Sequence, residues 1–209
     1  IVPPAFKGFT GYDFKQLKGY KYDPDKARQL MDEAGYADRS KFPPVNLQIN
    51  EGGGRNVHVA EAIQKMLTET LGIEVEILKI EFAQHYESLE SGRARFWRAG
   101  WIADYPDPEN FLDLLYGVNV PDDLNEKSYI NSVRYKSEAF DAIYSKAKLS
   151  ADREERTKLF LQCDQIALDD AAIIPIYYNI YHRLLQPYVK DFPQNPMEHR
   201  SFEEVYFVP

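Results

Sequence analysis

The stretch from Arg98 to Pro108, Arg-Ala-Gly-Trp-Ile-Ala-Asp-Tyr-Pro-Asp-Pro, concentrates residue types that can bind a charged organic ligand. A strand is predicted to end near Trp101, and Asp104 follows its carboxyl end, where ligands bind in open α/β sheets. The Asp104 carboxylate, beside the rings of Trp101 and Tyr105, could pair with a ligand ammonium group in a partly apolar pocket. The alternative is that Asp104 caps the following turn and Trp101 belongs to the core.

Three carboxylates in this region also allow an enzymatic interpretation. Asp104, Asp107 and Glu109 could form the carboxylate pair of a glycosidase or ligate Ca²⁺. The two prolines fit neither an EF-hand loop nor a known acid–base spacing, and turn and helix-start chemistry explains Asp107 and Glu109. A carboxylate-based hydrolase therefore remains an alternative, not the preferred hypothesis.

Other catalytic and metal motifs are missing from the sequence. It has no Gly-x-Ser-x-Gly elbow, and none of its four histidines has the spacing of a His-Glu-x-x-His site. Its one cysteine, Cys163, excludes an intramolecular disulfide and a Cys-cluster zinc site. We therefore predict no catalytic residue, no metal and no cofactor.

A triple glycine, Gly52–Gly54, precedes a predicted helix, and a helix N-terminus can bind an anion. Arg55 and His58 could then meet a ligand carboxylate. The spacing of a phosphate loop is absent, and a mobile surface loop is the favoured interpretation of the glycines.

Composition excludes several partners. The 209 residues carry 25 Lys and Arg against 33 Asp and Glu, a formal net charge of −8. This balance argues against sequence-independent binding to nucleic acid and against docking on anionic lipid, because both need a basic face. No apolar run approaches the ~20 residues of a transmembrane helix.

Hydrophobic periodicity predicts an α/β fold. Period-two segments predict strands over Val45–Asn50, Ile73–Ile80 and Phe96–Trp101, and helical spacing predicts helices over Val57–Leu71 and Ala83–Ser91 between them. Strands that alternate with helices indicate βαβ units and a mostly parallel sheet.

The second half is predicted to be mainly helical. A short helix covers Glu109–Tyr116, another starts at Ser137, and Asp152 with Glu155 forms a capping-box pattern for a long third helix. Residues Ile173–Ile180, rich in Ile and Tyr, are predicted to form a strand that a proline interrupts.

Several motifs, in one order, resemble the extracytoplasmic solute-binding proteins of peptide ABC transporters. The motifs are Tyr22–Ala27 with Ala34–Tyr36, Leu71–Val75, Arg98–Tyr105 with Asp107, Pro108 and Phe111, Arg153–Leu159, and Ile174–Tyr178. The match covers nearly all of the chain. Several motifs in the correct order are far more specific than any one of them.

The resemblance implies one lobe of a two-lobed periplasmic-binding-protein-type fold. Residues 1–184 would be the C-terminal lobe, and residues 185–209 a return segment that packs toward an N-terminal lobe lying outside this chain. Such receptors capture a ligand by closing on it and carry out no bond chemistry. The implied partners are peptides with a free N-terminus and the transmembrane subunits of an ABC permease. The implied location is periplasmic or extracytoplasmic, either free or anchored as a lipoprotein.

The resemblance also assigns roles to individual residues. Asp104 would pair with the peptide α-ammonium, Trp101 would line a side-chain pocket, and Arg98 would meet the ligand carboxylate; Arg55 and His58 are weaker carboxylate candidates. Family members also carry nickel chelates, haem or sugars, so a non-peptide solute remains an alternative. A stand-alone interaction module is a third possibility that does not explain the motif order.

Overall fold

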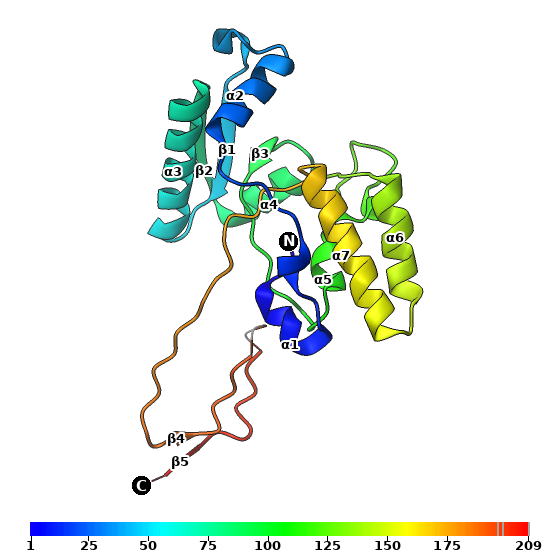
Figure 1. Cartoon of the computed structure of the whole chain (residues 1–209). Coiled ribbons are helices and arrows are strands. Elements are labelled where there is room, and N and C mark those ends of the chain that lie inside the picture. Colours follow the sequence, from blue (N-terminus) through cyan, green and yellow to red (C-terminus); the bar gives the residue numbers. More distant parts are fainter. Residues whose placement is uncertain (196, 198, 209) are drawn as a thin grey trace. The chain divides into compact units, whose positions relative to one another are not determined.

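The computed structural model describes residues 1–195, 197 and 199–208. The chain forms two compact units (Figure 1). The unit that we call the sheet unit comprises residues 19–100 and 120–134, and the helical unit comprises residues 1–18, 101–119 and those from 135 onward.

The sheet unit contains three parallel strands in the order β2-β1-β3. These are β1 (Val45–Asn50), β2 (Val75–Ile80) and β3 (Phe96–Trp97). Val45 lies opposite Val75, and Leu47 lies opposite both Ile77 and Phe96. The three predicted strand segments therefore share one parallel sheet, which confirms the α/β prediction.

β3 is shorter than the predicted strand Phe96–Trp101. The Arg98 amide donates one further bond, 2.9 Å long, to the carbonyl oxygen of Gln48. Because Gln48 is paired with Trp97 and β1 ends at Asn50, β1 offers only two more positions for pairing.

Three longer helices accompany the sheet. α3 (Gly54–Leu71) packs along β1 and β2, α2 (Pro24–Glu33) packs on α3, and α4 (Phe82–Glu90) contacts β1 (Figure 1). A short 3-10 turn, η3 (Arg39–Lys41), precedes β1. The buried core between sheet and helices consists of Leu47, Ile49, Ala60, Ile73 and Val75. Each such aliphatic side chain larger than alanine contributes ~1.5–3 kcal/mol when fully buried.

The ends of α3 illustrate one failed and one confirmed prediction. The helix begins at Gly54, so residues 54–56 form its first turn and are not part of a loop. The first turn tolerates glycine because its amides lack intrahelical partners in any sequence. Gly72 ends the helix with φ +68°, a left-handed conformation that costs glycine little.

The helical unit is built around the helix pair α6 (Glu138–Leu149) and α7 (Arg153–Asp169), which pack side by side (Figure 1). Its shorter elements are η1 (Pro4–Phe6), α1 (Lys7–Thr10), η2 (Phe14–Gln16), α5 (Glu109–Leu112), η4 (Asp113–Leu115), η5 (Gly117–Asn119), β4 (Val189–Lys190) and β5 (Tyr206–Phe207). Phe140, Tyr144, Phe160 and Cys163 are fully buried in this core.

The predicted caps of α6 and α7 form. Ser137 accepts the Phe140 amide, and Asp152 accepts the amides of Glu154 and Glu155. The capping box is only half formed, because the Glu155 carboxylate accepts the Ser150 hydroxyl at 2.7 Å instead of reaching back to the cap residue.

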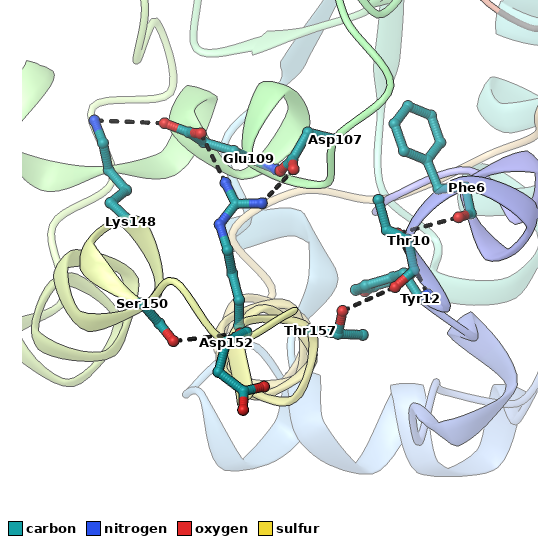
Figure 2. Close-up of polar contacts among 10 residues, drawn as sticks. Phe6, Thr10, Tyr12, Asp107, Glu109, Lys148, Ser150, Asp152 and Thr157 are labelled. Carbon is teal, nitrogen blue, oxygen red and sulfur yellow. Dashed lines mark hydrogen bonds and ion pairs between the residues drawn. The ribbon is translucent and has the colours of Figure 1, made fainter. Parts of the chain in front are cut away.

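Residues 1–18 are attached to α7 by buried and partly buried polar contacts. The carboxylate of the fully buried Asp164 accepts the Tyr12 hydroxyl and, at 3.2 Å, the Val2 amide. The Thr157 hydroxyl donates to the Thr10 carbonyl at 3.0 Å (Figure 2). Burial, reinforced by the Asp164 charge, raises the pKa of Tyr12 far above its ordinary value, so its hydroxyl remains a donor.

The prediction of a strand over Ile173–Ile180 is wrong. These residues follow α7 without regular secondary structure, and Ile180 is 80% exposed. Pro175 removes a backbone donor, and none of the described strands pairs with the segment. Further on, β4 and β5 form an antiparallel pair with Val189 opposite Phe207. Among the described residues, no helix combines the length and apolar character needed to cross a membrane.

Candidate functional site

Asn110 connects the two principal candidates, Trp101 and Asp104, within the helical unit. Its Oδ1 atom accepts the Trp101 indole N–H at 2.7 Å and the Asp104 backbone amide at 3.2 Å. Its Nδ2 atom donates to Asp104 Oδ2 at 3.1 Å. Asn110 lies on α5 and is only 6% exposed. Its side-chain amide is therefore buried, whereas Trp101 and Asp104, which it contacts, are exposed.

The exposure of these groups bears on the alternative interpretations. Trp101 is 44% exposed and therefore is not a core residue. Asp104 is exposed, and its side chain accepts a bond only from the Asn110 side chain among the described residues, not from a turn amide. The ring of Tyr105 is 43% exposed. Partial burial of its hydroxyl raises the pKa of Tyr105; a hydrogen bond with the Asn110 side chain opposes this rise, and the charges of nearby carboxylates add to it.

The other two carboxylates of the sequence cluster are occupied by cations from α6 and α7. Arg156 donates to Asp107 through Nη1 and to Glu109 through Nη2, the latter at 3.0 Å. Lys148 lies 3.6 Å from the other oxygen of Glu109 (Figure 2). The guanidinium of Arg156 also lies 4.7 Å from the ring centroid of Phe160. These contacts connect the segment that begins α5 to the helix pair. Because Asp107 and Glu109 are both bound to cations, neither is a free carboxylate that could act with Asp104 in acid–base chemistry.

Arg98 lies in the sheet unit at the carboxyl end of β3. Its Nη1 atom donates to Asn50 Oδ1 at 2.9 Å. Asn56, in the first turn of α3, also approaches Asn50 Oδ1, at 3.5 Å. The half-buried Arg98 guanidinium is thereby held at the carboxyl end of β1, beside the start of α3.

A buried histidine fixes the backbone of Arg98. His85 on α4 is 0% exposed; its Nε2 lies 2.9 Å from the Arg98 carbonyl oxygen and its Nδ1 lies 3.0 Å from Gln48 Nε2. Because a carbonyl only accepts and an amide nitrogen only donates, the imidazole is neutral with its proton on Nε2. Burial lowers the pKa of His85, and the charge of Arg98 acts in the same direction.

The weaker candidates, Arg55 and His58, lie in the first turns of α3 and are exposed. His58 points toward Glu61, with Nδ1 3.3 Å from a carboxylate oxygen. Gly53 precedes the helix without a side-chain cap. The six predicted residues thus fall into two groups: Trp101, Asp104 and Tyr105 belong to the helical unit, and Arg98, Arg55 and His58 belong to the sheet unit.

Asn110, Asn50 and His85 are site-supporting residues that sequence reasoning missed. The sequence offered a signal for Asn110 alone, which directly precedes the apolar Phe111 and Leu112; all three residues are buried. Within the described parts of the chain, no group of three or more His, Cys, Asp and Glu side chains is placed to hold a metal ion.

Comparison with known proteins identifies the family of this chain. Residues 1–122 match the model described as bacterial extracellular solute-binding proteins, family 5, middle region. Periplasmic oligopeptide-binding protein OppA of Escherichia coli (strain K12) is 29% identical over 88% of this chain and 32% of its own length. Heme-binding protein A of Haemophilus influenzae (strain Rd) is 30% identical over 96% of this chain and 35% of its own length.

A solved structure supports the same assignment. The structure of the Escherichia coli murein tripeptide binding protein MppA aligns with a TM-score of 0.75 and 26% identity, covering 89% of this chain and 35% of that one. The chain thus spans about a third of the length of the curated relatives that it matches. Family model, relatives and fold agree: this chain belongs to the bacterial extracellular solute-binding proteins of family 5.

Proposed function

We propose that residues 1–209 act as one lobe of an extracytoplasmic receptor that captures peptides and delivers them to an ABC permease. Membership of the solute-binding family supports the receptor role, and the names of the oligopeptide- and dipeptide-binding relatives support peptide as the solute. In this proposal residues 1–184 form the C-terminal lobe. Residues 185–209 are the return segment toward an N-terminal lobe supplied by another part of the receptor chain; positions 196, 198 and 209 of this segment lie outside the residues that the structure describes.

The observation that carries the proposal is the arrangement of Asp104. Its carboxylate is exposed and anchored through one oxygen, beside the half-exposed ring of Trp101. A fixed carboxylate next to an aromatic face suits a peptide α-ammonium group, which gains a charge-assisted hydrogen bond and an apolar neighbour. Trp101 and Tyr105 then line a side-chain pocket.

In the sheet unit, Arg98 is the proposed partner of the ligand carboxylate, with Arg55 and His58 as secondary cationic groups. Arg98 is held by Asn50 and His85, whereas Arg55 and His58 lie exposed on α3. Recognition of a ligand terminus by its charge, together with main-chain contacts, tolerates many peptide sequences. This mechanism requires capture and release but no catalytic step.

The test is calorimetric titration of the receptor chain that carries residues 1–209 together with its N-terminal lobe. The ligands are a tripeptide and a pentapeptide with free N-termini, haem, a nickel chelate and an oligosaccharide. We expect saturable binding of at least one peptide with negligible heat from the other solutes. Tight binding of haem, chelate or sugar without peptide binding would replace the peptide assignment. Cell fractionation and lipid labelling of the same receptor distinguish a free periplasmic form from a lipid-anchored one.

A further inference from the structure

We propose that Asn110 is the positioning residue of the ammonium site and that it couples the charge-binding group, Asp104, to the aromatic group, Trp101. The inference rests on the proposed function for its ligand, but its geometric basis lies entirely within the helical unit. Asn110 itself is almost fully buried, and its side chain bonds to Trp101 and Asp104. We therefore assign it a role in positioning these two residues and not in contacting the ligand.

The orientation of the Asn110 amide is determined by its partners. The Trp101 indole N–H and the Asp104 backbone N–H can only donate, and both meet the same oxygen, Oδ1. The amino group is then left facing Asp104 Oδ2, which accepts at 3.1 Å. A flipped amide would set its single NH2 group against two donors and its oxygen against a carboxylate. Three contacts therefore fix one orientation.

This orientation fixes the rotamer of Asp104. Its side chain is exposed and would otherwise sample several rotamers, at an entropic cost when a ligand orders it. With Oδ2 bound to Asn110, no other described residue donates to Oδ1, which is left for an incoming cation. Asn110 thus organises the carboxylate before the ligand arrives.

The same amide transmits changes between the two binding groups. Movement of the Trp101 ring to admit a larger side chain alters its bond to Asn110 Oδ1, which also holds the Asp104 amide. The preference for a side chain and the affinity for the ammonium group should therefore be interdependent.

The first experiment measures the ratio of dissociation constants for an N-acetylated and a free-amine peptide, by calorimetry on the complete receptor. Asn110→Ala should lower this ratio roughly tenfold to a hundredfold, the range expected for losing hydrogen bonds to a charged group. The matched control is Glu109→Gln on the same helix, which weakens the contacts to Arg156 and Lys148 but should leave the ratio unchanged. An unchanged ratio in Asn110→Ala would overturn the proposal.

The second experiment uses Asn110→Asp, which preserves the acceptor for Trp101 but places a second carboxylate at the Asp104 oxygen. Two carboxylates at such a distance share a proton. An arriving ammonium group favours full ionisation, so binding should release up to one proton over the pH range in which the pair holds that proton, and affinity should rise with pH through that range. Titration in buffers of different ionisation enthalpy detects this release. Release equal to that of the wild type would show that residue 110 does not face Asp104.

A ligand-free measurement separates failure of this inference from failure of the proposed function. The chain has two tryptophans, so its nitrogen–proton correlation spectrum contains two indole signals. Asn110→Ala should accelerate solvent exchange of the Trp101 indole proton, while Glu109→Gln should not. If exchange accelerates but the receptor binds no peptide, the positioning role stands and the peptide assignment falls. If exchange is unchanged, Asn110 does not hold Trp101.

Discussion

The imidazole of His85 lies with Nε2 2.9 Å from the backbone carbonyl oxygen of Arg98, so a buried side chain of α4 holds the point where β3 ends. Through Nδ1 the same ring contacts Gln48, whose Oε1 accepts the Ser88 hydroxyl at 3.2 Å. This chain of bonds connects β1, α4 and the segment after β3. The contact with Gln48 requires a neutral imidazole, because Nδ1 must accept from the Gln48 amide group.

Acidification should therefore weaken the sheet unit through His85. Its pKa in the folded chain is lowered from 6.5, so the unfolded chain binds the proton more tightly. The stabilisation is complete above about pH 6.5 and is lost as pH falls below that value, with a slope of at most ~1.4 kcal/mol per pH unit. Urea denaturation between pH 5 and 7.5 measures it.

The variant His85→Gln separates the contribution of His85 to the free energy of unfolding from that of the carboxylates, which also titrate in acid. The difference in free energy of unfolding between wild type and His85→Gln should shrink as pH falls. The exposed His182, which takes no part in the contacts of His85, provides the control as His182→Gln. A wild-type advantage over His85→Gln that is constant with pH would contradict the neutral imidazole.

Asp164 should be the polar residue whose loss most destabilises the helical unit. Asp164→Ala leaves the Tyr12 hydroxyl and the Val2 amide buried without an acceptor. Unsatisfied buried donors cost ~1–3 kcal/mol each, so for these two donors we expect a loss of ~2–6 kcal/mol in urea denaturation. Lys158→Gln on the exposed side of α7 should change stability by less than ~0.5 kcal/mol. Equal effects of the two variants would show that residues 1–18 are not anchored at Asp164.

Asp107 should affect stability but not ligand affinity. Asp107→Asn breaks its ion pair with Arg156, in which both side chains are only about one-fifth exposed, and should cost about 1 kcal/mol. Peptide affinity should remain within a factor of two, because Asp107 faces α7. A selective loss of affinity without loss of stability would place Asp107 in the site and reopen the carboxylate-pair interpretation.

A methyl group at Gly117 should disturb the start of α6. A Cβ atom at residue 117 would collide with Oδ2 of Asp141, and Oδ1 of the same carboxylate accepts the Gly117 amide at 2.8 Å. Gly117→Ala must displace the carboxylate and should cost ~1–3 kcal/mol. Gly8 in α1 has open space around it, so Gly8→Ala should be neutral or stabilising by up to ~1 kcal/mol. Thermal unfolding of the two variants compares these sites directly, and equal melting temperatures would contradict the contact.

Elements whose bounds depend on nearby residues were predicted well from the sequence. Alternating residues in Val45–Asn50 predicted β1 with its observed bounds, and the predicted helix end at Leu71 is also observed, with the left-handed Gly72 following it. The run Gly52–Gly54 obscured the start of α3, because glycine is typical of loops and yet Gly54 is the first residue of the helix.

Strands that depend on a distant partner were predicted less well. Ile173–Ile180 has a strand-like composition, but composition does not supply a neighbour for pairing. β3 likewise pairs with β1 only as far as Trp97 opposite Gln48, and the length of that pairing depends on the partner strand and register as well as on the residues of β3.

The exposed residues of the site could be predicted from the sequence, but the buried residues that hold them could not. Trp101 and Asp104 stood out through residue type and position after a strand. Asn110 and His85 could not be found in this way, because their roles follow from contacts that only the folded chain creates. His85 meets Gln48 from 37 residues away.

The most direct test of the account is a double cycle on Asp104 in the complete receptor. Asp104→Asn keeps the shape of the side chain but removes its charge, and a bound α-ammonium would lose its partner. Breaking a buried pair costs ~3–5 kcal/mol. That is roughly two to three and a half decades in affinity.

N-acetylation of the peptide should cause a similar loss with wild-type receptor. It should cause little further loss with Asp104→Asn, because both changes delete the same interaction. Calorimetric titration of both proteins with both peptides gives the four required affinities. The account predicts that the two losses are strongly non-additive. Additive losses would mean that Asp104 does not bind the peptide ammonium group, and the central assignment would be wrong.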